Sequence, residues 1–408
     1  MTGWLGNFTA LTALRALNVL LPLALYPWLM AQLGAETLGL VIFAQAVATY
    51  FMVIPNYSME TFGTKAIADA AQQPEHLWTT TNSLYALKGL LFLASGLAYA
   101  LLCWLWPFAR ENALLFLLSL HVVVLEAFLP TWFYQGIQDI KQASYLNGMA
   151  KAIAVVWLLF TVRHPHDAFH VPLGYLIGSL FASGMGYLWV QGHTGPLKPW
   201  ASPWRASQKY LKLGWPFFLT SLNGVLYVYA NRILMGYFGM AQVAYYDLAE
   251  KWVQIAKAPQ QILGLTLFPK ITQDAHPKAL IRRFAYPSMA FNVLLFLGIL
   301  WGAPWLVQWM APGVSAQGQA TTIALMRILS FNIVIIGLNN IVVVQRMLAL
   351  GHEHRIVRFT LETLLIFVAM GVFLYASGYY SMQGLTWIAV LTETYLLLRS
   401  WFYLRRHG

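Results

Sequence analysis

Residues 89–109 read GLLFLASGLAYALLCWLWPFA, a run of 21 residues without a charged side chain. An α-helix needs about twenty mainly apolar residues to cross the hydrocarbon core of a bilayer. The whole chain has the same character, since 59% of its 408 residues are hydrophobic, 10% are charged and the mean hydropathy is +0.60. An ordinary soluble domain carries roughly 25% charged residues. The composition therefore predicts a polytopic membrane protein rather than two or three soluble domains.

Apolar stretches of similar length recur along the chain and predict about twelve membrane-spanning helices. They lie near residues 8–32, 37–60, 79–106, 112–134, 143–162, 169–191, 213–236, 243–268, 284–310, 319–346, 356–378 and 381–402. The first stretch is too long for the core of a signal peptide, so we expect it to be retained. The connections between the stretches are short, which leaves no room for a folded soluble domain.

The distribution of Lys and Arg predicts the orientation of these helices. With the N-terminus placed in the cytoplasm, the inner loops and the C-terminal tail hold 15 Lys and Arg, whereas the outer loops hold only Arg110 and Arg163. The net charge of +11 is therefore interpreted as a topology signal and not as a nucleic-acid-binding surface. An even number of spans with both termini in the cytoplasm follows from this distribution.

A faint internal repeat divides the chain into halves. Asn18 is followed sixteen residues later by Gly34, and Asn223 is followed sixteen residues later by Gly239, which places the two pairs 205 residues apart. Six helices in each half would make both halves cross the membrane in the same direction. We expect an all-α integral membrane fold of two six-helix bundles related by a parallel pseudo-two-fold repeat. The N-terminal bundle, the basic cytoplasmic linker and the C-terminal bundle are predicted at residues 1–191, 192–212 and 213–408.

Of the 25 Lys and Arg, eight lie within predicted spans. Each would cost roughly 2.5–3.5 kcal/mol at the bilayer centre, so all but Arg399, which can snorkel to the inner face, should face the bundle interior or a hydrated cavity. Arg offers a bidentate fork and Lys a point charge for phosphate. The residues predicted to line a cationic, phosphate-binding cavity are Arg15, Lys88, Lys151, Arg232, Lys257 and Arg327.

Acidic residues within the spans offer an alternative role for these cations. Asp247 and Lys251 stand four residues apart and predict a salt bridge within one helix. Arg15, Lys88, Arg232 and Arg327 have no acidic residue within four positions, and pairing across helices, for instance with Glu126 or Glu393, stays open. The residues considered for ion coupling are Glu126, Asp247 and Glu250.

The sequence offers little for catalysis. Cys103 is the single cysteine, so neither an internal disulfide nor a thiolate metal cluster is possible. No GxxxxGK[ST] motif for nucleotide binding occurs. The outer cluster of His164, His166 and Asp167, with His170 close behind, is interpreted as a solvated loop. No catalytic residue, metal ion, cofactor or nucleic acid is expected.

Several short motifs resemble one family of membrane proteins. The most specific is WFYQG at 132–136, within FLPTWFYQGIQ at 128–138. The others are Leu17-Asn18 through Pro22 with Leu33-Gly34 and Gly39, Asn147 with Lys151, NRILMG at 231–236, Tyr245-Tyr246 with Ala249, and LFPK at 267–270. Together they resemble the Wzx-type polysaccharide flippases, which share the MOP superfamily with the lipid II flippase and the MATE drug exporters.

This resemblance implies the transfer of an undecaprenyl-pyrophosphate-linked oligosaccharide, such as an O-antigen repeat unit, across the bacterial inner membrane by alternating access. It implies membrane lipids and the polysaccharide polymerase machinery as partners, and Arg15 and Arg232 as headgroup contacts. Two alternatives remain. A MATE-like drug exporter of organic cations should have an acidic chamber, and an integral-membrane polymerase or ligase should have a large outer loop.

The topology can be tested with a reporter fused after Gly408. Because the basic residues place the C-terminus in the cytoplasm, we expect green fluorescent protein to fluoresce there and alkaline phosphatase to stay inactive. Phosphatase activity at this position would contradict the assignment. A fusion in the predicted outer loop at Arg163 serves as the control and should give the opposite pair of signals.

Overall fold

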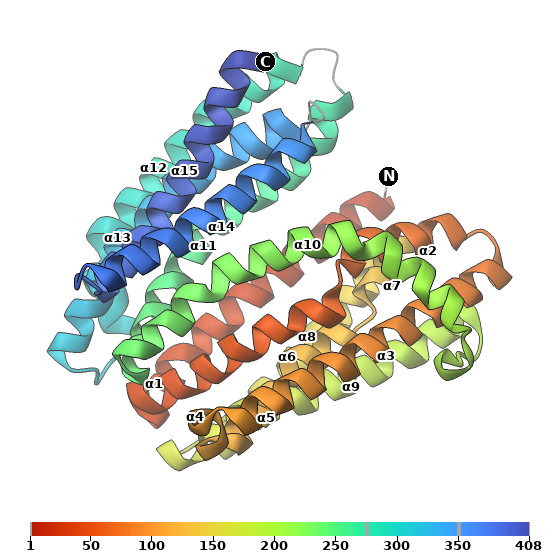
Figure 1. Ribbon diagram of the computed structural model, residues 1–408, viewed down its shortest axis with the longest axis horizontal. Coiled ribbons are helices and arrows are strands. Elements are labelled where there is room, and N and C mark those ends of the chain that lie inside the picture. Colours follow the sequence, from red (N-terminus) through yellow and green to blue (C-terminus); the bar gives the residue numbers. More distant parts are fainter. Residues whose placement is uncertain (1, 274–276, 349–351, 408) are drawn as a thin grey trace. The chain divides into compact units, whose positions relative to one another are not determined.

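The computed structural model describes residues 2–273, 277–348 and 352–407, apart from the side chains of residues 2–23 and of some later helical positions. All regular elements in these ranges are helices, which Figure 1 follows along the chain. The long helices are α1 Thr2–Asn56, α3 Pro74–Leu105, α8 Ile140–Thr161, α9 His170–Thr194, α10 Trp204–Met235, α11 Met240–Gln273, α12 Pro277–Met310, α13 Ala316–Asn339, α14 Glu353–Ala376 and α15 Met382–His407.

Shorter helices connect them. They are α2 Thr64–Ala70, α4 Pro107–Glu111, α5 Ala113–Ser119, α6 His121–Phe128 and α7 Thr131–Gly136, with the π-helices η1 Met59–Gly63 and η5 Asn340–Leu348 and the 3-10 helices η2 Pro165–Phe169, η3 Pro199–Ala201 and η4 Gly236–Phe238.

Eight helical segments within the described ranges are long and apolar enough to cross a membrane, the longest being Ala24–Ala70. The chain is therefore a multi-pass, all-helical membrane protein, as the hydropathy predicts. The total of twelve spans stays a prediction.

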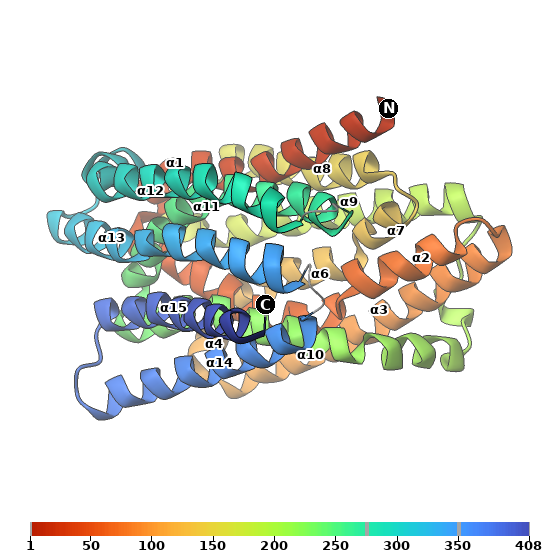
Figure 2. The ribbon, with the colours of Figure 1, turned by 90° about the horizontal axis from the view of Figure 1, so that it is seen from above.

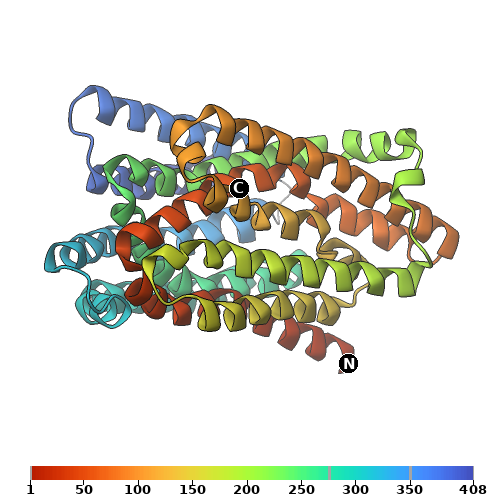
Figure 3. The same cartoon turned by 90° about the horizontal axis from the view of Figure 1, so that it is seen from below.

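The chain divides into two compact units. Unit 1 contains Met1–Leu21 and Leu40–Val225, and unit 2 contains Pro22–Gly39 and Leu226–Gly408. In unit 1, α8 and α9 run side by side (Figure 3). In unit 2, α13 lies between α12 and α15 (Figure 2) and also contacts α11. The bundle boundaries predicted from the sequence stay a prediction.

The two glycines of the predicted repeat occupy corresponding turns. Gly34 interrupts α1 with φ 73° and ψ 165°, and Gly239 precedes α11 with φ 115° and ψ 157°. Positive φ is readily adopted only by glycine, because it lacks a Cβ atom. The faint sequence match therefore marks two like backbone turns, 205 residues apart.

The turn after Gly34 packs against the start of α11 within unit 2. The Glu36 carboxylate accepts a hydrogen bond of 3.0 Å from the backbone N–H of Ala241. This places a negative charge at the positive end of the α11 dipole. Gly39 approaches so closely that an added Cβ would overlap the carbonyl oxygen of Met240. Both contacts require the backbone after Gly34 to lie close to the first residues of α11.

The WFYQG motif forms part of the core of unit 1. Trp132, Phe133 and Tyr134 on α7 are at most 1% exposed. A Cβ atom at Gly136 would lie 2.6 Å from the side chain of Ile67, so only glycine allows α7 and α2 to pack this closely. The motif that is most specific to the family thus packs against neighbouring helices.

Two prolines leave backbone carbonyls that side chains from other helices satisfy. Pro55 has no N–H for the carbonyl of Phe51, four residues earlier, and Ser95 Oγ on α3 donates to that oxygen at 2.7 Å. Pro304 likewise has no N–H for the carbonyl of Leu300, and Arg327 Nε on α13 donates to it at 3.2 Å. Membrane helices tolerate proline when neighbouring groups restore such bonds.

The first of these contacts can be tested by a mutant cycle. Ser95→Ala should lower the free energy of unfolding by about 1 kcal/mol, because the Phe51 carbonyl loses its donor. In a Pro55→Ala background, in which the helical N–H is restored, the same change should cost almost nothing. The measurement is thermal unfolding of the purified protein in detergent.

Ser119→Ala is the matched control, because Ser119 is equally buried and its hydroxyl donates to Leu115 of its own short helix. Its effect should be the same with and without Pro55. An equal cost of Ser95→Ala in both backgrounds would show that the hydroxyl does not substitute for the missing N–H.

Candidate functional site

Unit 1 buries a lysine among apolar helices. Lys88 on α3 is 1% exposed, and the carboxylates of Glu126 on α6 and Glu60 on η1 lie within electrostatic range of its ammonium group. Glu126 Oε1 also accepts a hydrogen bond of 2.8 Å from Asn56 Nδ2. A charge this deep needs opposite charge and hydrogen-bonding groups nearby. Lys88 therefore has carboxylate neighbours on other helices, one of the alternatives that the sequence left open.

The backbone beside this cluster is strained. Tyr57 and Ser58 have φ angles of 43° and 55°, which non-glycine residues adopt rarely. Asn56 Oδ1 accepts the Ser58 N–H at 3.0 Å, and the Ser58 and Ser221 hydroxyls lie 2.6 Å apart. Tyr57 stacks on Phe218 with 4.9 Å between ring centroids. Such strain persists only where several contacts hold it and concentrates at functional sites.

Unit 2 holds a larger group of charges, here called the unit 2 charge cluster and formed by Arg232, Asp247, Glu250, Lys251, Lys257 and Glu393. Arg232 Nε on α10 lies 2.9 Å from Glu250 Oε2 and 3.2 Å from Asp247 Oδ1, both on α11. Lys251 pairs with Asp247 within α11, as the spacing predicts. Arg232 is thus held by two carboxylates of the neighbouring helix.

Further interactions connect the cluster to Lys257 and Gln254 on α11 and to Glu393 on α15. The ammonium of Lys257 lies in the electrostatic field of Glu250 and of Glu393 on α15. Asn339 Nδ2 on α13 donates to Glu393 Oε2 at 2.9 Å, and Gln254 Nε2 donates to Glu250 Oε1 at 3.0 Å. Positions 247, 250, 251, 254 and 257 recur at helical spacing and share one face of α11.

The charges in this cluster balance, three basic against three acidic side chains. Tyr26 on α1 supports it, since its hydroxyl donates to the carbonyl of Ala244 at 2.6 Å and its ring lies 5.0 Å from the Lys251 ammonium. That these residues line a cationic lumen stays a prediction. The structure places Arg232 and Lys251 of this cluster in contact with carboxylates.

The predicted cavity residues are distributed between the units. Lys88 and Glu126 come together in unit 1, and Arg232, Lys257, Asp247 and Glu250 come together in unit 2. Lys151 is half-buried on α8, and Arg327 is exposed on α13 and bonded to Leu300. Arg15 lies outside the residues whose side chains are described. Their shared role in substrate binding stays a prediction.

Several polar residues of these sites escaped the sequence-based search because they carry no charge. Asn56, Asn339 and Gln254 donate hydrogen bonds to carboxylates, and the N–H of Ser58 donates to the Asn56 side chain. The signal for Asn56 and Ser58 was present, since an Asn-Tyr-Ser segment directly after Pro55 is typical of a turn that interrupts an apolar helix.

The cluster of His164, His166 and Asp167 has a local structural role. Asp167 Oδ2 accepts hydrogen bonds of 2.9 Å from the backbone N–H groups of Arg163 and His164 and so caps η2. His164 stacks on His166, which is mostly exposed.

With the fold and both clusters described, the chain can be compared with known proteins. Residues 4–273 match the family model described as "Polysaccharide biosynthesis protein". The chain belongs to this family. A relative in Shigella dysenteriae named "Putative O-antigen transporter" is 24% identical over 307 residues, which cover 74% of this chain and 76% of the relative.

Solved structures give the fold of this polysaccharide biosynthesis protein. The lipid II flippase MurJ in an inward closed conformation matches with a TM-score of 0.74 at 11% identity, covering 98% of this chain and 87% of MurJ. An inward-facing MATE transporter of the MOP superfamily matches with a TM-score of 0.71 at 12% identity, covering 94% of each chain. The family model and the Shigella dysenteriae relative confirm the resemblance to Wzx-type polysaccharide flippases. The relative is named as a transporter, and the solved structures show the shared fold.

The pairing of Arg232 can be tested by removing its charge. Arg232→Gln should lower stability by about 3 kcal/mol, because it leaves the Asp247 and Glu250 carboxylates with one cation fewer in a buried site. Adding Glu250→Gln should recover part of the loss, since one uncompensated charge disappears. Thermal unfolding of the purified protein in detergent measures both effects.

Arg163→Gln provides the control, because Arg163 is exposed and its backbone supplies the only contact described for it here. Its unfolding temperature should stay close to that of the unaltered protein. Equal shifts for Arg163→Gln and Arg232→Gln would show that the pairs with Asp247 and Glu250 contribute nothing to stability.

Proposed function

We propose that this protein transfers an undecaprenyl-pyrophosphate-linked oligosaccharide, an O-antigen or other surface polysaccharide repeat unit, from the cytoplasmic to the periplasmic leaflet of the inner membrane. Both termini are cytoplasmic in this proposal. Membership of the polysaccharide biosynthesis family, the name of the Shigella dysenteriae relative and the fold shared with the lipid II flippase support it.

The observation that carries the proposal is the placement of basic side chains inside apolar helices in each unit. Lys88 is fully buried. Arg232 forms an ion pair with Glu250, and Lys257 lies within electrostatic range of the same carboxylate. Burying such groups costs free energy that packing does not return. A requirement to bind the anionic pyrophosphate explains why the chain retains them, because Arg and Lys form strong charge-assisted hydrogen bonds with phosphate oxygens.

The carboxylates give these cations a partner when no substrate is bound. Asp247 and Glu250 hold Arg232, and Glu126 lies beside Lys88. In the proposed cycle the pyrophosphate replaces a carboxylate as the partner of the basic group, and uptake of a proton or cation by the displaced carboxylate restores neutrality. Glu126, Asp247 and Glu250 are the proposed coupling residues, with Arg15, Lys151 and Arg327 as further substrate contacts.

A drug exporter is the second candidate, because the fold is also that of a MATE transporter and the unit 2 charge cluster contains three carboxylates. An exporter of organic cations would use these carboxylates to bind its substrate, whereas a flippase uses the cations beside them. The two functions therefore predict opposite effects of neutralising the acidic and the basic side chains.

The test is transfer in vesicles. Purified protein is reconstituted with a polyprenyl-pyrophosphate-linked disaccharide that carries a fluorophore on the sugar, and externally added dithionite bleaches only the outward-facing label. In vesicles that contain the unaltered protein, the label that starts in the inner leaflet should move outward, so dithionite should bleach nearly all of the fluorescence rather than about half. Lys88→Ala and Lys257→Ala should each slow this about tenfold or more, as expected for the loss of a charge-assisted contact.

Lys141→Ala is the matched control, because Lys141 is exposed at the start of α8, and it should transfer at the normal rate. Lys88→Arg should recover much of the activity if charge is the requirement. Transport of ethidium without transfer of the labelled lipid, lost in Glu250→Gln and kept in Lys257→Ala, would replace the flippase assignment with the exporter.

A further inference from the structure

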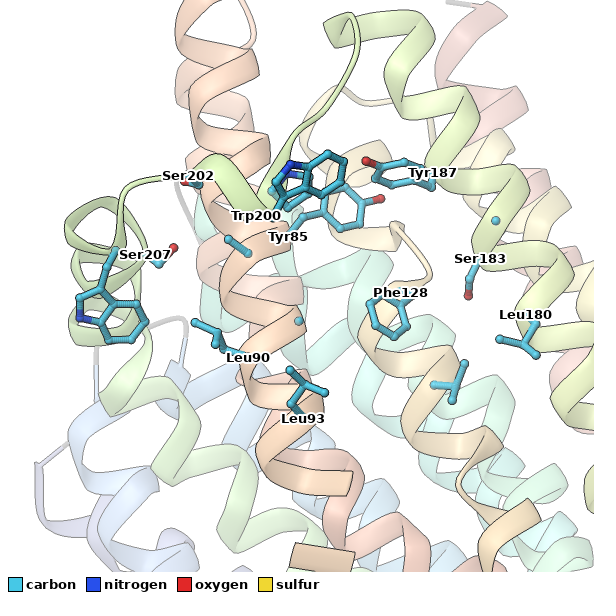
Figure 4. Close-up of a pocket in the computed structure, with 16 residues that line it drawn as sticks. Tyr85, Leu90, Leu93, Phe128, Leu180, Ser183, Tyr187, Trp200, Ser202 and Ser207 are labelled. Atoms are coloured by element: carbon cyan, nitrogen blue, oxygen red, sulfur yellow. The ribbon is translucent and has the colours of Figure 1, made fainter. Parts of the chain in front are cut away.

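Unit 1 contains a pocket of about 730 Å³ that includes no residue of the charge clusters. Helices α3, α6 and α9 form its walls, and η3 with the first turn of α10 forms one end. Figure 4 shows Leu90 and Leu93 on one side of it and Phe128 and Leu180 on the other, with Tyr85, Tyr187 and Trp200 at the end near the linker. The pocket is thus mostly apolar, with polar groups near one end.

The apolar part is open at the surface. Leu90, Leu93 and Leu180 are 46%, 59% and 55% exposed, as expected of side chains that face lipid. Gly89 on α3 and Gly184 on α9 line the same region, and a Cβ atom added at either would meet nothing within 4 Å. The glycines leave open space along the apolar walls of the pocket.

Two buried hydroxyl groups line this pocket. Tyr85 is 5% exposed and Ser183 is 6% exposed, and neither Tyr85 Oη nor Ser183 Oγ has a hydrogen-bond partner among the residues that the structure describes. An unsatisfied hydroxyl in an apolar site costs roughly 1–3 kcal/mol. A ligand that supplies hydrogen-bond acceptors at this depth would remove that cost.

The end of the pocket near η3 is aromatic, and basic residues adjoin its lining residues in sequence. The backbone N–H of Lys198 donates to Asn82 Oδ1 on α3 at 2.6 Å, which fixes the linker one turn from Tyr85. Trp200 and Trp204 line the pocket, and the exposed Lys198 and Arg205 flank them in sequence. Tryptophan beside basic residues is typical of protein that meets lipid headgroups, which on the cytoplasmic side are often anionic.

We infer that this pocket binds an anionic glycerophospholipid from the surrounding bilayer. Its phosphate lies near Lys198 and Arg205, its ester carbonyls accept hydrogen bonds from Tyr85 and Ser183, and one acyl chain follows the wall formed by Leu90, Leu93 and Leu180. A polyprenyl chain is pure hydrocarbon and would leave both hydroxyls unsatisfied. The ester carbonyls distinguish the bilayer lipid from the proposed substrate, so the inference does not depend on the proposed function.

Native mass spectrometry of the detergent-purified full chain tests the inference. The protein is incubated with dioleoyl phosphatidylglycerol or with the diether analogue, which has the same headgroup and chains but lacks carbonyls. The ester lipid should be retained about fivefold more strongly, as expected for one or two hydrogen bonds. Tyr85→Phe with Ser183→Ala should abolish this preference. Equal retention of the two lipids by the unaltered protein would overturn the inference.

Glycine variants locate the bound lipid. Gly89→Leu fills this open space and should reduce phosphatidylglycerol retention about tenfold. Gly96→Leu is the matched control, because Gly96 is on the same helix, also has nothing within 4 Å and does not line the pocket. Equal retention by these two variants would contradict the site. Displacement of phosphatidylglycerol by an equimolar amount of polyprenyl phosphate would assign the pocket to the substrate tail instead.

Discussion

Hydrocarbon offers no hydrogen bond and no opposite charge, so a polar group inside this protein is costly unless another part of the chain or a bound ligand supplies a partner. The prolines illustrate the constraint on the backbone, since Ser95 and Arg327 reach from neighbouring helices to carbonyls that Pro55 and Pro304 leave without donors. The same constraint applies to the charged side chains, for which the free-energy cost of lacking a partner is higher. Arg232 has two carboxylates from the adjacent helix, and each carboxylate has a second donor.

These pairs explain how charged side chains inside the helices are compatible with a stable membrane fold. An isolated cation at the depth of Lys88 or Lys257 would oppose insertion, whereas a nearby carboxylate lowers that cost and can give way to a stronger anion. Lys88 lies within electrostatic range of Glu126 in unit 1, and Arg232 forms an ion pair with Glu250 in unit 2. The same residues therefore contribute both to stability and to the proposed exchange of partners.

The sequence predicted local features better than contacts between helices. Long apolar stretches and the pair of Asp247 and Lys251 depend on residues close in the chain, and the structure contains them. The repeated Gly34 and Gly239, noted in the sequence only as a repeat, both lie at turns with positive φ. The partners of Arg232 lie 15 and 18 residues away on an adjacent helix, a distance at which spacing alone gives no rule. Arg327 was predicted as a cavity residue because its charge is visible in the sequence, whereas its bond to a carbonyl left free by proline requires the packing of α12 and α13.

The turn that follows Gly34 has a consequence for biosynthesis. Glu36 and Gly39 belong to unit 2, yet their contacts, Ala241 and Met240, are made about two hundred residues later on the ribosome. The helices of unit 1 can pack before Met240 and Ala241 have been synthesised, because domains generally fold as the chain emerges. Residues 22–39 are therefore made early but are among the last to reach their native surroundings. A nascent chain released before α11 would leave the Glu36 carboxylate and the backbone near Gly39 exposed to quality-control proteases.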